Sequence, residues 1–226
     1  YKIFKHCKIL RADEDSMFDM RYTKAIIVEY NTEPTLIESE SIKNKYGFSP
    51  QYYMTYQFDK GMIIDVIYYL IDKIDSINDK HHRILILFKN IDHVDTMLEK
   101  CQERYGDNHI IGRYHGNVSS EEKECTLQCA DIIISTYQSF GTGIDVSNIK
   151  YVISTNQCNK IEDNQAAGRA RPMKDGSDVF YFMLIDKGFK YCTTKLKTRL
   201  SYLNQTKIKQ IVKIKYESSG GTTSNV

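Results

Sequence analysis

The sequence predicts an α/β domain with a mainly parallel sheet covered by helices on both faces. Apolar runs of strand length alternate along the chain with longer segments whose apolar residues recur at helical spacing. Residues 84–88 and 132–134 are apolar without interruption, as expected of strands buried on both faces. Polar turns follow these strands, and sheets of this kind bind ligands at the carboxyl ends of their strands. The pattern thus predicts both the fold class and the functional edge of the sheet.

Each predicted element rests on its own pattern of residues. Residues 60–77 carry an apolar helical stripe at positions 63, 64, 67, 70, 71, 74 and 77. Residues 92–105 form an amphipathic helix that ends at a glycine, and Ser119 and Glu122 have the spacing of a capping box that starts a helix through about residue 128. Residues 178–186 are rich in side chains that favour strands. Strands are predicted at residues 25–30, 84–88, 110–116, 131–136, 150–154, 178–186 and 207–215, and further helices at 188–203 and from Gln165.

The composition of the chain restricts the class of protein. Its 226 residues suffice for one α/β domain with an extension, or for two small units. A hydrophobic fraction of 41% can bury a sizeable core, and a net charge of +2 argues against nonspecific charge-driven binding as the whole function. No stretch approaches the roughly 20 apolar residues of a membrane span, and no secretory signal is visible. Tyr1 as the first residue suggests a chain cut from a longer protein.

Cysteines and acidic residues give no sign of a metal site. Of the six cysteines, only Cys125 and Cys129 are close in sequence, and no CxxC pair or histidine–cysteine cluster of zinc spacing is present. The acidic run at residues 13–16 follows residues 8–12, which make a poor hydrophobic strand, so a solvated acidic loop is expected there rather than a Mg²⁺ site. Reduced thiols in a cytosolic or nuclear compartment, and no bound metal, are therefore expected.

Two polar segments that follow strands hold most of the functional information. Residues 135–145 read Ser-Thr-Tyr-Gln-Ser-Phe-Gly-Thr-Gly-Ile-Asp, and residues 165–171 read Gln-Ala-Ala-Gly-Arg-Ala-Arg. A guanidinium is permanently charged and binds phosphate oxygens in a bidentate manner, so the arginines indicate a phosphate ligand. In chain order, residues 83–90, 114–116, 135–149 and 165–171 resemble motif IV, the strand end after it, motif V and motif VI of the second RecA-like domain of superfamily 2 helicases.

Over about residues 50–186 the chain is similar to the phage branch-migration helicase and related helicases of large DNA viruses, including the poxvirus transcript-release type. The resemblance implies a RecA-like domain at 50–186, a lead-in from an N-terminal motor domain at 1–49, and a basic C-terminal extension with a flexible tail at 187–226. No G-x-x-x-x-G-K-[S/T] loop occurs in the chain, so ATP with Mg²⁺ would be bound mainly by an absent N-terminal RecA-like domain. The full-length parent would be an ATP-dependent helicase, and the isolated chain would not hydrolyse ATP.

By the resemblance, Gln165 and Arg169 face the cleft between the two motor domains and reach the γ-phosphate of ATP. They are four residues apart and would share one face of a helix. Such an arginine neutralises charge during phosphoryl transfer, an effect worth about 10³–10⁵ in rate. The family commonly places this arginine seven residues after the glutamine, where this chain has Pro172. Arg171 is one residue short and Pro172 disfavours helix there, so Arg169 is the first candidate for catalysis and Arg171 the second.

The resemblance also assigns contacts to motif V and to the strand ends. Gly143 would permit a tight turn, and Asp145 would face the nucleotide ribose or the first domain, with a turn or capping role as the alternative. Thr136 would hold a nucleic-acid phosphate through its hydroxyl, because short polar groups position a strand without reading its sequence. Further contacts to nucleic acid are expected at Lys89, Asn90, His115, Gly116 and Gln138, with a hydrogen-bonded structural role as the alternative for the histidine.

The leading hypothesis is the second motor half of an ATP-dependent DNA or RNA helicase or translocase. It would act in the cytoplasm or nucleus, or in the host cytoplasm or virion for a virus, without a membrane partner. A nucleic-acid binding module with a degenerate, non-hydrolysing motor fold is the alternative, and the departure at Pro172 favours it. A Rossmann-like enzyme would need a G-x-G-x-x-G turn, which the chain lacks. The lysine-rich segment at 187–215 lines a nucleic-acid path or is a solvated helix face, and the sequence favours neither.

Overall fold

The computed structural model describes residues 8–12, 22–45, 47–77, 82–141, 146–155, 160–170, 172–203 and 208–217. The strands in this part of the chain are β1 (Lys8–Ala12), β2 (Thr23–Tyr30), β3 (Lys43–Asn44), β4 (Gly47–Phe48), β5 (Arg83–Phe88), β6 (Ile111–Tyr114), β7 (Ile132–Thr136), β8 (Ile149–Ser154), β9 (Val179–Asp186) and β10 (Ile208–Lys215). The helices are α1 (Leu36–Ser41), α2 (Pro50–Asp59), α3 (Met62–Asp75), α4 (Ile91–Tyr105), α5 (Ser120–Cys129), α6 (Tyr137–Gly141), α7 (Lys160–Ala167) and α8 (Lys190–Leu203).

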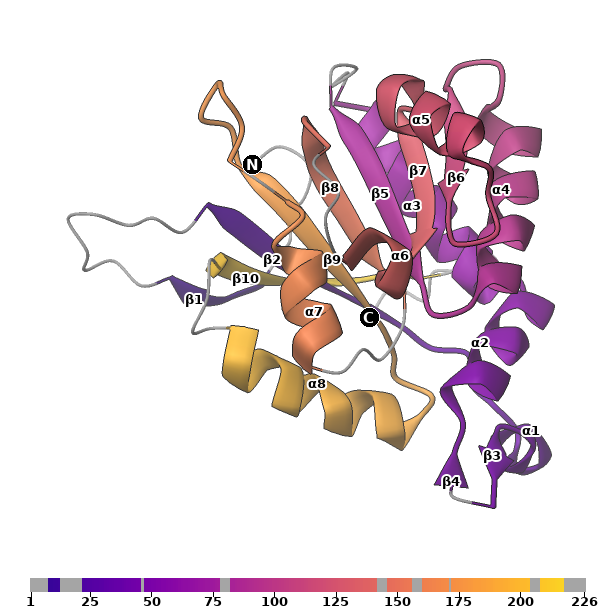
Figure 1. The fold of residues 1–226 in the computed structure, drawn as a ribbon. Coiled ribbons are helices and arrows are strands. Elements are labelled where there is room, and N and C mark those ends of the chain that lie inside the picture. The colour runs from indigo at the N-terminus through magenta and orange to yellow at the C-terminus, as the bar shows by residue number, and fades with distance from the viewer. Residues whose placement is uncertain are drawn as a thin grey trace.

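Eight of these strands form one sheet in the order β1-β10-β2-β9-β8-β5-β7-β6 (Figure 1). All neighbouring pairs are parallel except β1 and β10, which are antiparallel at one edge. Strands β3 and β4 form a separate small hairpin. The predicted fold class, a mainly parallel α/β sheet with helices on both faces, is therefore confirmed.

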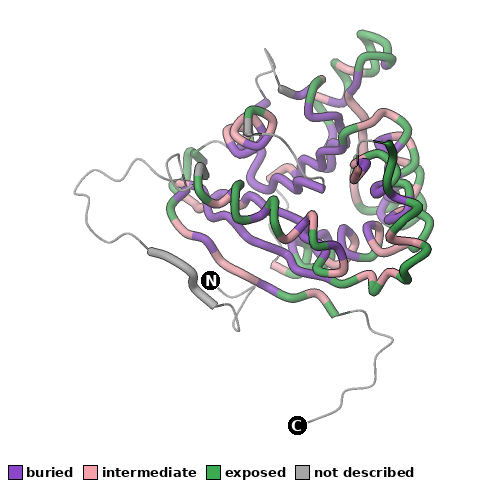
Figure 2. Tube along the Cα trace, turned by 90° about the horizontal axis from the view of Figure 1, so that it is seen from below, coloured by how far each residue is buried: buried purple, intermediate pink, exposed green. Residues whose placement is uncertain are grey.

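The sheet separates two hydrophobic cores. Helices α6, α7 and α8 pack on one face, and α2, α3 and α4 pack on the other. Strand β5 serves both cores, since Leu85 and Leu87 belong to the first and Ile84, Ile86 and Phe88 to the second. This alternation follows from the two-residue period of a strand. Figure 2 shows the buried residues concentrated along the strands and on the inward sides of the helices.

The sheet extends beyond the boundaries suggested by the resemblance. Strand β2 comes from the 1–49 segment and lies between β10 and β9. Its residues Ala25, Ile26, Ile27 and Val28 are all buried, because neighbouring strands and helices cover both faces. Strand β10 comes from the 187–226 segment and pairs with β2. Residues 8–12, expected to make a poor strand, form the edge strand β1.

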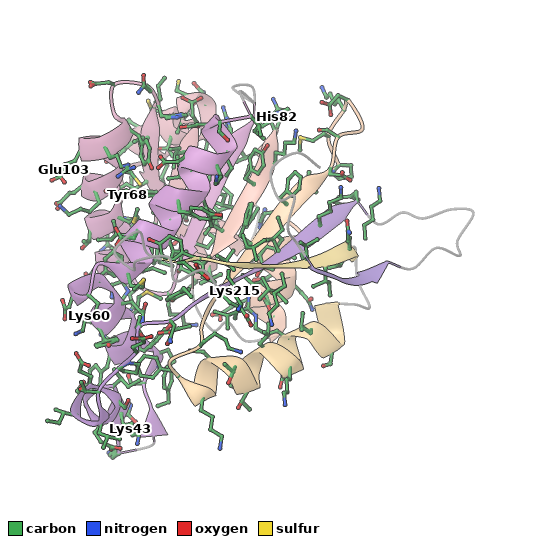
Figure 3. All side chains as sticks on the ribbon, turned by 180° about the vertical axis from the view of Figure 1, so that it is seen from behind. Lys43, Lys60, Tyr68, His82, Glu103 and Lys215 are labelled. Carbon is green, nitrogen blue, oxygen red and sulfur yellow. The ribbon has the colours of Figure 1, made fainter. Side chains whose placement is uncertain are left out.

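The segment between β2 and α3 projects from the carboxyl end of the sheet. It contains α1, the β3–β4 hairpin and α2, a helix that the sequence analysis did not predict. Gly61, with φ of 70°, separates α2 from α3, and α3 begins two residues after the start predicted for the helix at 60–77. In Figure 3, Lys43 and Lys60 lie at the opposite end of the molecule from His82, which precedes β5.

Asp186, the last residue of β9, anchors this projecting segment to the sheet. Its carboxylate accepts hydrogen bonds from Thr32 Oγ1 at 2.6 Å, Gln57 Nε2 at 2.9 Å and the Gly188 amide at 2.8 Å. Burial raises the pKa of the Asp186 carboxyl above its ordinary value, although the hydrogen bonds from Thr32 and Gly188 act in the opposite direction. A Cβ atom at Gly188 would lie 2.7 Å from Pro34 Cδ, so this close approach requires glycine.

Candidate nucleotide and nucleic-acid site

The candidate residues gather at the carboxyl edge of the sheet. Lys89 follows β5, His115 follows β6 and Thr136 ends β7, and these three strands are neighbours in the sheet. Because parallel strands end at the same edge, the polar groups expected from three separate motifs meet there. Helices α6 and α7, which carry parts of motifs V and VI, pack against each other beside this edge.

Lys89 forms an ion pair that connects β5 to α7. Its Nζ contacts Oε1 of Glu162, in the first turn of α7. The Lys89 side chain is 47% exposed and that of Glu162 is 18% exposed, so solvent still reaches the lysine. Asn90 is half-buried and occupies the N-cap position of α4. The residue expected to contact nucleic acid is therefore joined to the helix expected to contact ATP.

Arg169 lies in the turn that follows α7 rather than on the helix. The helix ends at Ala167, and the Arg169 amide bonds to the carbonyl of Ala166 at 3.0 Å. Gly168, a residue of low helix propensity, occupies the point where the helix stops. The expectation that Gln165 and Arg169 share one continuous helix is therefore wrong. The Arg169 guanidinium carbon lies 5.8 Å from the centre of the Phe140 ring on α6, which joins motif VI to motif V.

A buried ion pair fixes the position of α7. Arg199 of α8 is 1% exposed and Asp163 of α7 is fully buried, and both bonds between them, Nε to Oδ2 and Nη2 to Oδ1, measure 2.6 Å. The same Nη2 lies 3.3 Å from Ser154 Oγ of β8, and the Tyr181 hydroxyl of β9 bonds to the Asp163 carboxylate. Tyr137 of α6 reaches Ser154 Oγ at 2.9 Å. Two strands and three helices thus meet at one polar cluster beneath α7.

Thr136 uses its hydroxyl within the protein. The Thr136 Oγ1 atom accepts from the Ser139 amide at 3.1 Å and donates to Ser139 Oγ at 2.9 Å. The residue is only 4% exposed, so it stabilises the first turn of α6. Gln138, by contrast, is exposed at the start of that helix. Among the described residues of motif V, Gln138, Ser147 and Asn148 are exposed polar side chains, and Gln138 is the one on α6.

His115 is also held inside the protein. It is 2% exposed, and its Nε2 lies 3.1 Å from Oδ1 of Asp95 on α4. Arg113 contacts the same Asp95 oxygen at 2.8 Å and Glu122 at 2.8 Å, which binds β6 to α4 and α5. The structural role weighed for His115 therefore agrees with its surroundings. The neighbouring Gly116 is exposed.

Three of the expected site residues, Gly143, Asp145 and Arg171, lie outside the described residues. In the described ranges, no group of three or more histidine, cysteine, aspartate or glutamate side chains could hold a metal ion. None of the helices in the same ranges has the length and apolar character needed to cross a membrane.

Sequence reasoning missed Glu162, Asp163 and Arg199. The partners of the buried pair are 36 residues apart on different helices, and no local spacing connects them. The only signal was indirect: Arg199 interrupts the apolar stripe of a predicted helix at a position that faces the sheet. Glu162 carried no signal, since an acidic residue on the first turn of a helix is ordinary.

The fold and this edge define a class of protein. A mainly parallel sheet with strand-end polar groups and an arginine-bearing turn at one edge is the arrangement of a RecA-like domain. Residues 63–172 match the family model described as the helicase conserved C-terminal domain. This match covers 110 of the 226 residues, and the fold is that of a RecA-like domain. None of the curated protein sequences compared with the chain matches it.

Solved helicase structures share the fold. T4 UvsW has a TM-score of 0.59 and 17% identity, and the match covers 88% of this chain and 42% of UvsW. Domain 2 of the DEAD-box helicase Mss116p, bound to an RNA duplex, has a TM-score of 0.58 and 13% identity over 87% of this chain and 65% of that one. Dbp5 of S. cerevisiae, bound to RNA and ADP BeF3, has a TM-score of 0.52 and 12% identity over 88% and 42%. The chain thus spans less than two thirds of each.

Proposed function

We propose that the chain is the second motor half of an ATP-dependent helicase or translocase that acts on DNA or RNA. The observation that carries this proposal is the match of residues 63–172 to the helicase C-terminal family. Within this range, Lys89, Gln165 and Arg169 belong to elements that meet at one edge of the sheet. The partner at this edge would be an N-terminal RecA-like domain of the same protein, which supplies the phosphate-binding loop. The parent protein would act inside the cell, or in the host cytoplasm or virion for a virus.

The described residues fit a supporting role in ATP hydrolysis. Bound ATP with Mg²⁺ supplies the phosphoryl group, whose transfer is catalysed mainly by positioning and by electrostatic stabilisation. Arg169 is held against Phe140 and offers a permanent positive charge. Gln165, half-buried on α7, offers an amide that binds either a phosphate oxygen or a water molecule. The buried Asp163–Arg199 pair below makes α7 a rigid support for both.

Contacts to nucleic acid would come from the accessible strand ends. Lys89 and Gln138 are exposed, and Asn90 begins a 15-residue helix whose first amides favour an anion. Thr136 and His115 would act indirectly, by holding the turns that carry these side chains. Gly143, Asp145 and Arg171 stay as further candidates of motifs V and VI. Contacts of this kind bind the phosphate backbone and do not read base sequence.

A non-hydrolysing binding module is the second candidate. The observation in its favour is that Pro172 replaces the usual arginine position and that Arg169 has left the helix. Such a protein would keep the nucleic-acid contacts and lack ATP turnover.

Replacement of Arg169 by alanine in the complete protein tests the proposal. We expect kcat for ATP hydrolysis to fall by about 10³–10⁵, the range for arginine fingers, with nucleic-acid affinity nearly unchanged. Lys174→Ala removes an exposed positive charge nearby and should leave both quantities unchanged. Normal turnover in Arg169→Ala together with an inactive Arg171→Ala would move the catalytic role to Arg171. A complete protein without ATP turnover would favour the binding module.

A further inference from the structure

The segment that follows β9 is basic throughout. Residues 187–216 contain nine lysines and arginines and no aspartate or glutamate. The structure places seven of these cations in two groups. Lys215 of β10 is exposed and belongs to neither group, and Lys207 lies outside the described residues. Those of the first group are paired with carboxylates from β2, α7 or the turn before β9: Lys187 with Glu29 at 3.6 Å, Lys213 with Glu29 at 2.7 Å, Lys209 with Asp178 at 3.5 Å and Arg199 with Asp163 at 2.6 Å.

The second group lies on α8. Lys190, Lys195 and Lys197 are exposed, and among the described residues no carboxylate forms an ion pair with any of them. In the described part of the chain, no carboxylate therefore neutralises these three charges. A helix that carries three such lysines and no acidic side chain produces a positive surface potential.

The arrangement of side chains on α8 separates this surface from the core. The buried face of the helix holds Cys192, Leu196 and Arg199. Because each residue of a helix turns by about 100°, the opposite face is formed by residues that carry only ammonium or hydroxyl groups: Lys190, Thr194, Lys197, Thr198 and Ser201. Lys195 is exposed on the flank of the helix, beyond Tyr191. Figure 1 shows α8 on the outside of the molecule, next to α7.

We propose that the outer face of α8 binds the phosphate backbone of a nucleic-acid strand, as a second contact beyond the strand ends of the sheet. This inference rests on the proposed function, because it extends the path of the same nucleic acid. Ammonium and hydroxyl groups are the donors that commonly bind backbone phosphates. The absence of carboxylates in the surrounding 30-residue segment makes the face complementary to a polyanion.

Tyr191 of α8 makes its ring contacts within the protein. The Tyr191 ring stacks on Phe48 of the β3–β4 hairpin, with ring centres 3.9 Å apart and planes at 11°. Lys195 Nζ lies 5.5 Å from the centre of the same ring. Phe48 therefore covers one face of the Tyr191 ring, which a base would otherwise need for stacking. The surface offers charge and hydroxyl groups, which recognise phosphate.

The contact would also be coupled to the motor. Arg199 joins α8 to Asp163 of α7, the helix that carries Gln165 and Glu162. A strand held on the outer face of α8 would therefore be attached to the same rigid unit as the candidate ATP-site residues. Helix α7 and the backbone of the bound nucleic acid would then move together.

Titration of labelled oligothymidylate and oligouridylate with the 226-residue chain across salt concentrations tests the proposal. The variant carries Lys190→Gln, Lys195→Gln and Lys197→Gln. We expect about tenfold weaker binding at low salt and a salt slope lower by about 2, since each lost phosphate contact removes about 0.7 for single strands. The control variant, Lys43→Gln, Lys73→Gln and Lys100→Gln, changes the net charge equally on β3, α3 and α4. It should bind as the parent chain does.

Each outcome decides the proposal. The expected loss in the α8 variant alone, with unchanged thermal unfolding, supports it. Binding that is unchanged in the α8 variant but reduced by Lys89→Ala would overturn the α8 inference and leave the proposed function standing. Equal losses in both triple variants would show a net-charge effect and also overturn it. No binding of either oligonucleotide at low salt would overturn both. Binding of the α8 lysines to phosphatidylserine vesicles instead of oligonucleotides would overturn the α8 inference alone, because the family match at residues 63–172 does not include α8.

Discussion

At the scale of single residues, the pair formed by Lys89 and Glu162 connects the two halves of the candidate site. The lysine follows the motif IV strand, and the glutamate belongs to the helix that carries Gln165. Ion pairs near the surface contribute only about 0–1 kcal/mol, so a backbone phosphate can take the place of the Glu162 carboxylate. Nucleic-acid binding and the position of α7 would then be linked through one lysine.

Replacement of Glu162 by glutamine should therefore tighten binding. The Lys89 ammonium would no longer have a competing carboxylate, and we expect up to about a fivefold gain in affinity for single strands, which corresponds to about 1 kcal/mol. Fluorescence anisotropy at low salt measures it. Glu124→Gln on α5 removes the same charge from an exposed site and should have a smaller effect. A gain that persists when Lys89→Ala is added would show that Lys89 is not its origin.

At the scale of elements, the Asp163–Arg199 pair decides where α7 lies. The helix has only eight residues, too few to be stable by itself, so its position depends on tertiary contacts. Ala166 and Ala167 pack on the first core, and the ion pair binds the helix to α8, β8 and β9. An ion pair so deeply buried loses much of its Coulomb energy to desolvation, but removal of one partner leaves an uncompensated charge.

Arg199→Met should accordingly destabilise the chain by about 3–5 kcal/mol, because Asp163 would remain buried without its partner. Urea unfolding followed by circular dichroism measures the change. The additional change Asp163→Leu should recover part of the loss, since it removes the unpaired charge. Arg104→Met breaks an ion pair with Asp72 whose side chains are both 48% exposed, and it should cost no more than about 1 kcal/mol. Equal effects of Arg199→Met and Arg104→Met would contradict the role of burial.

At the scale of the whole molecule, the proposed function makes the chain one side of a site. The given sequence contains no G-x-x-x-x-G-K-[S/T] loop, and the chain spans 42% of the length of T4 UvsW. The polar residues at the carboxyl edge and Arg169 supply charge and hydrogen bonds, whereas the groups that would hold Mg²⁺ and most of the nucleotide are expected on the partner domain.

The isolated chain should consequently show no ATP hydrolysis, with or without nucleic acid. Phosphate release at high protein concentration measures this, with the complete protein as the positive control. Turnover by the 226-residue chain that disappears in Arg169→Ala would contradict the half-site arrangement, because it would require a full ATP site within this chain. Turnover that survives Arg169→Ala and is removed by further purification would indicate a contaminant.

The sequence by itself determined much of the fold and indicated the edge of the sheet where we propose the functional site. Uninterrupted apolar runs such as residues 84–88 gave strands close to the observed bounds, because burial on both faces leaves a local signature. The strand ends after β5, β6 and β7 were identified for the same reason. The order of the motifs along the chain pointed to the helicase C-terminal family, whose model residues 63–172 match.

Only the tertiary structure decided how these parts meet. The insertion of β2 beside β9, the pairing of Arg199 with Asp163 and the bond from Lys89 to Glu162 join residues far apart in the chain, and local periodicity carries no information on such partners. Thr136 and His115 are buried, although nucleic-acid contacts were predicted for them. Helix α7 ends before Arg169, for which a contact to ATP was predicted. Sequence patterns record which face of an element is buried, whereas hydrogen-bond partners depend on which elements the fold brings together.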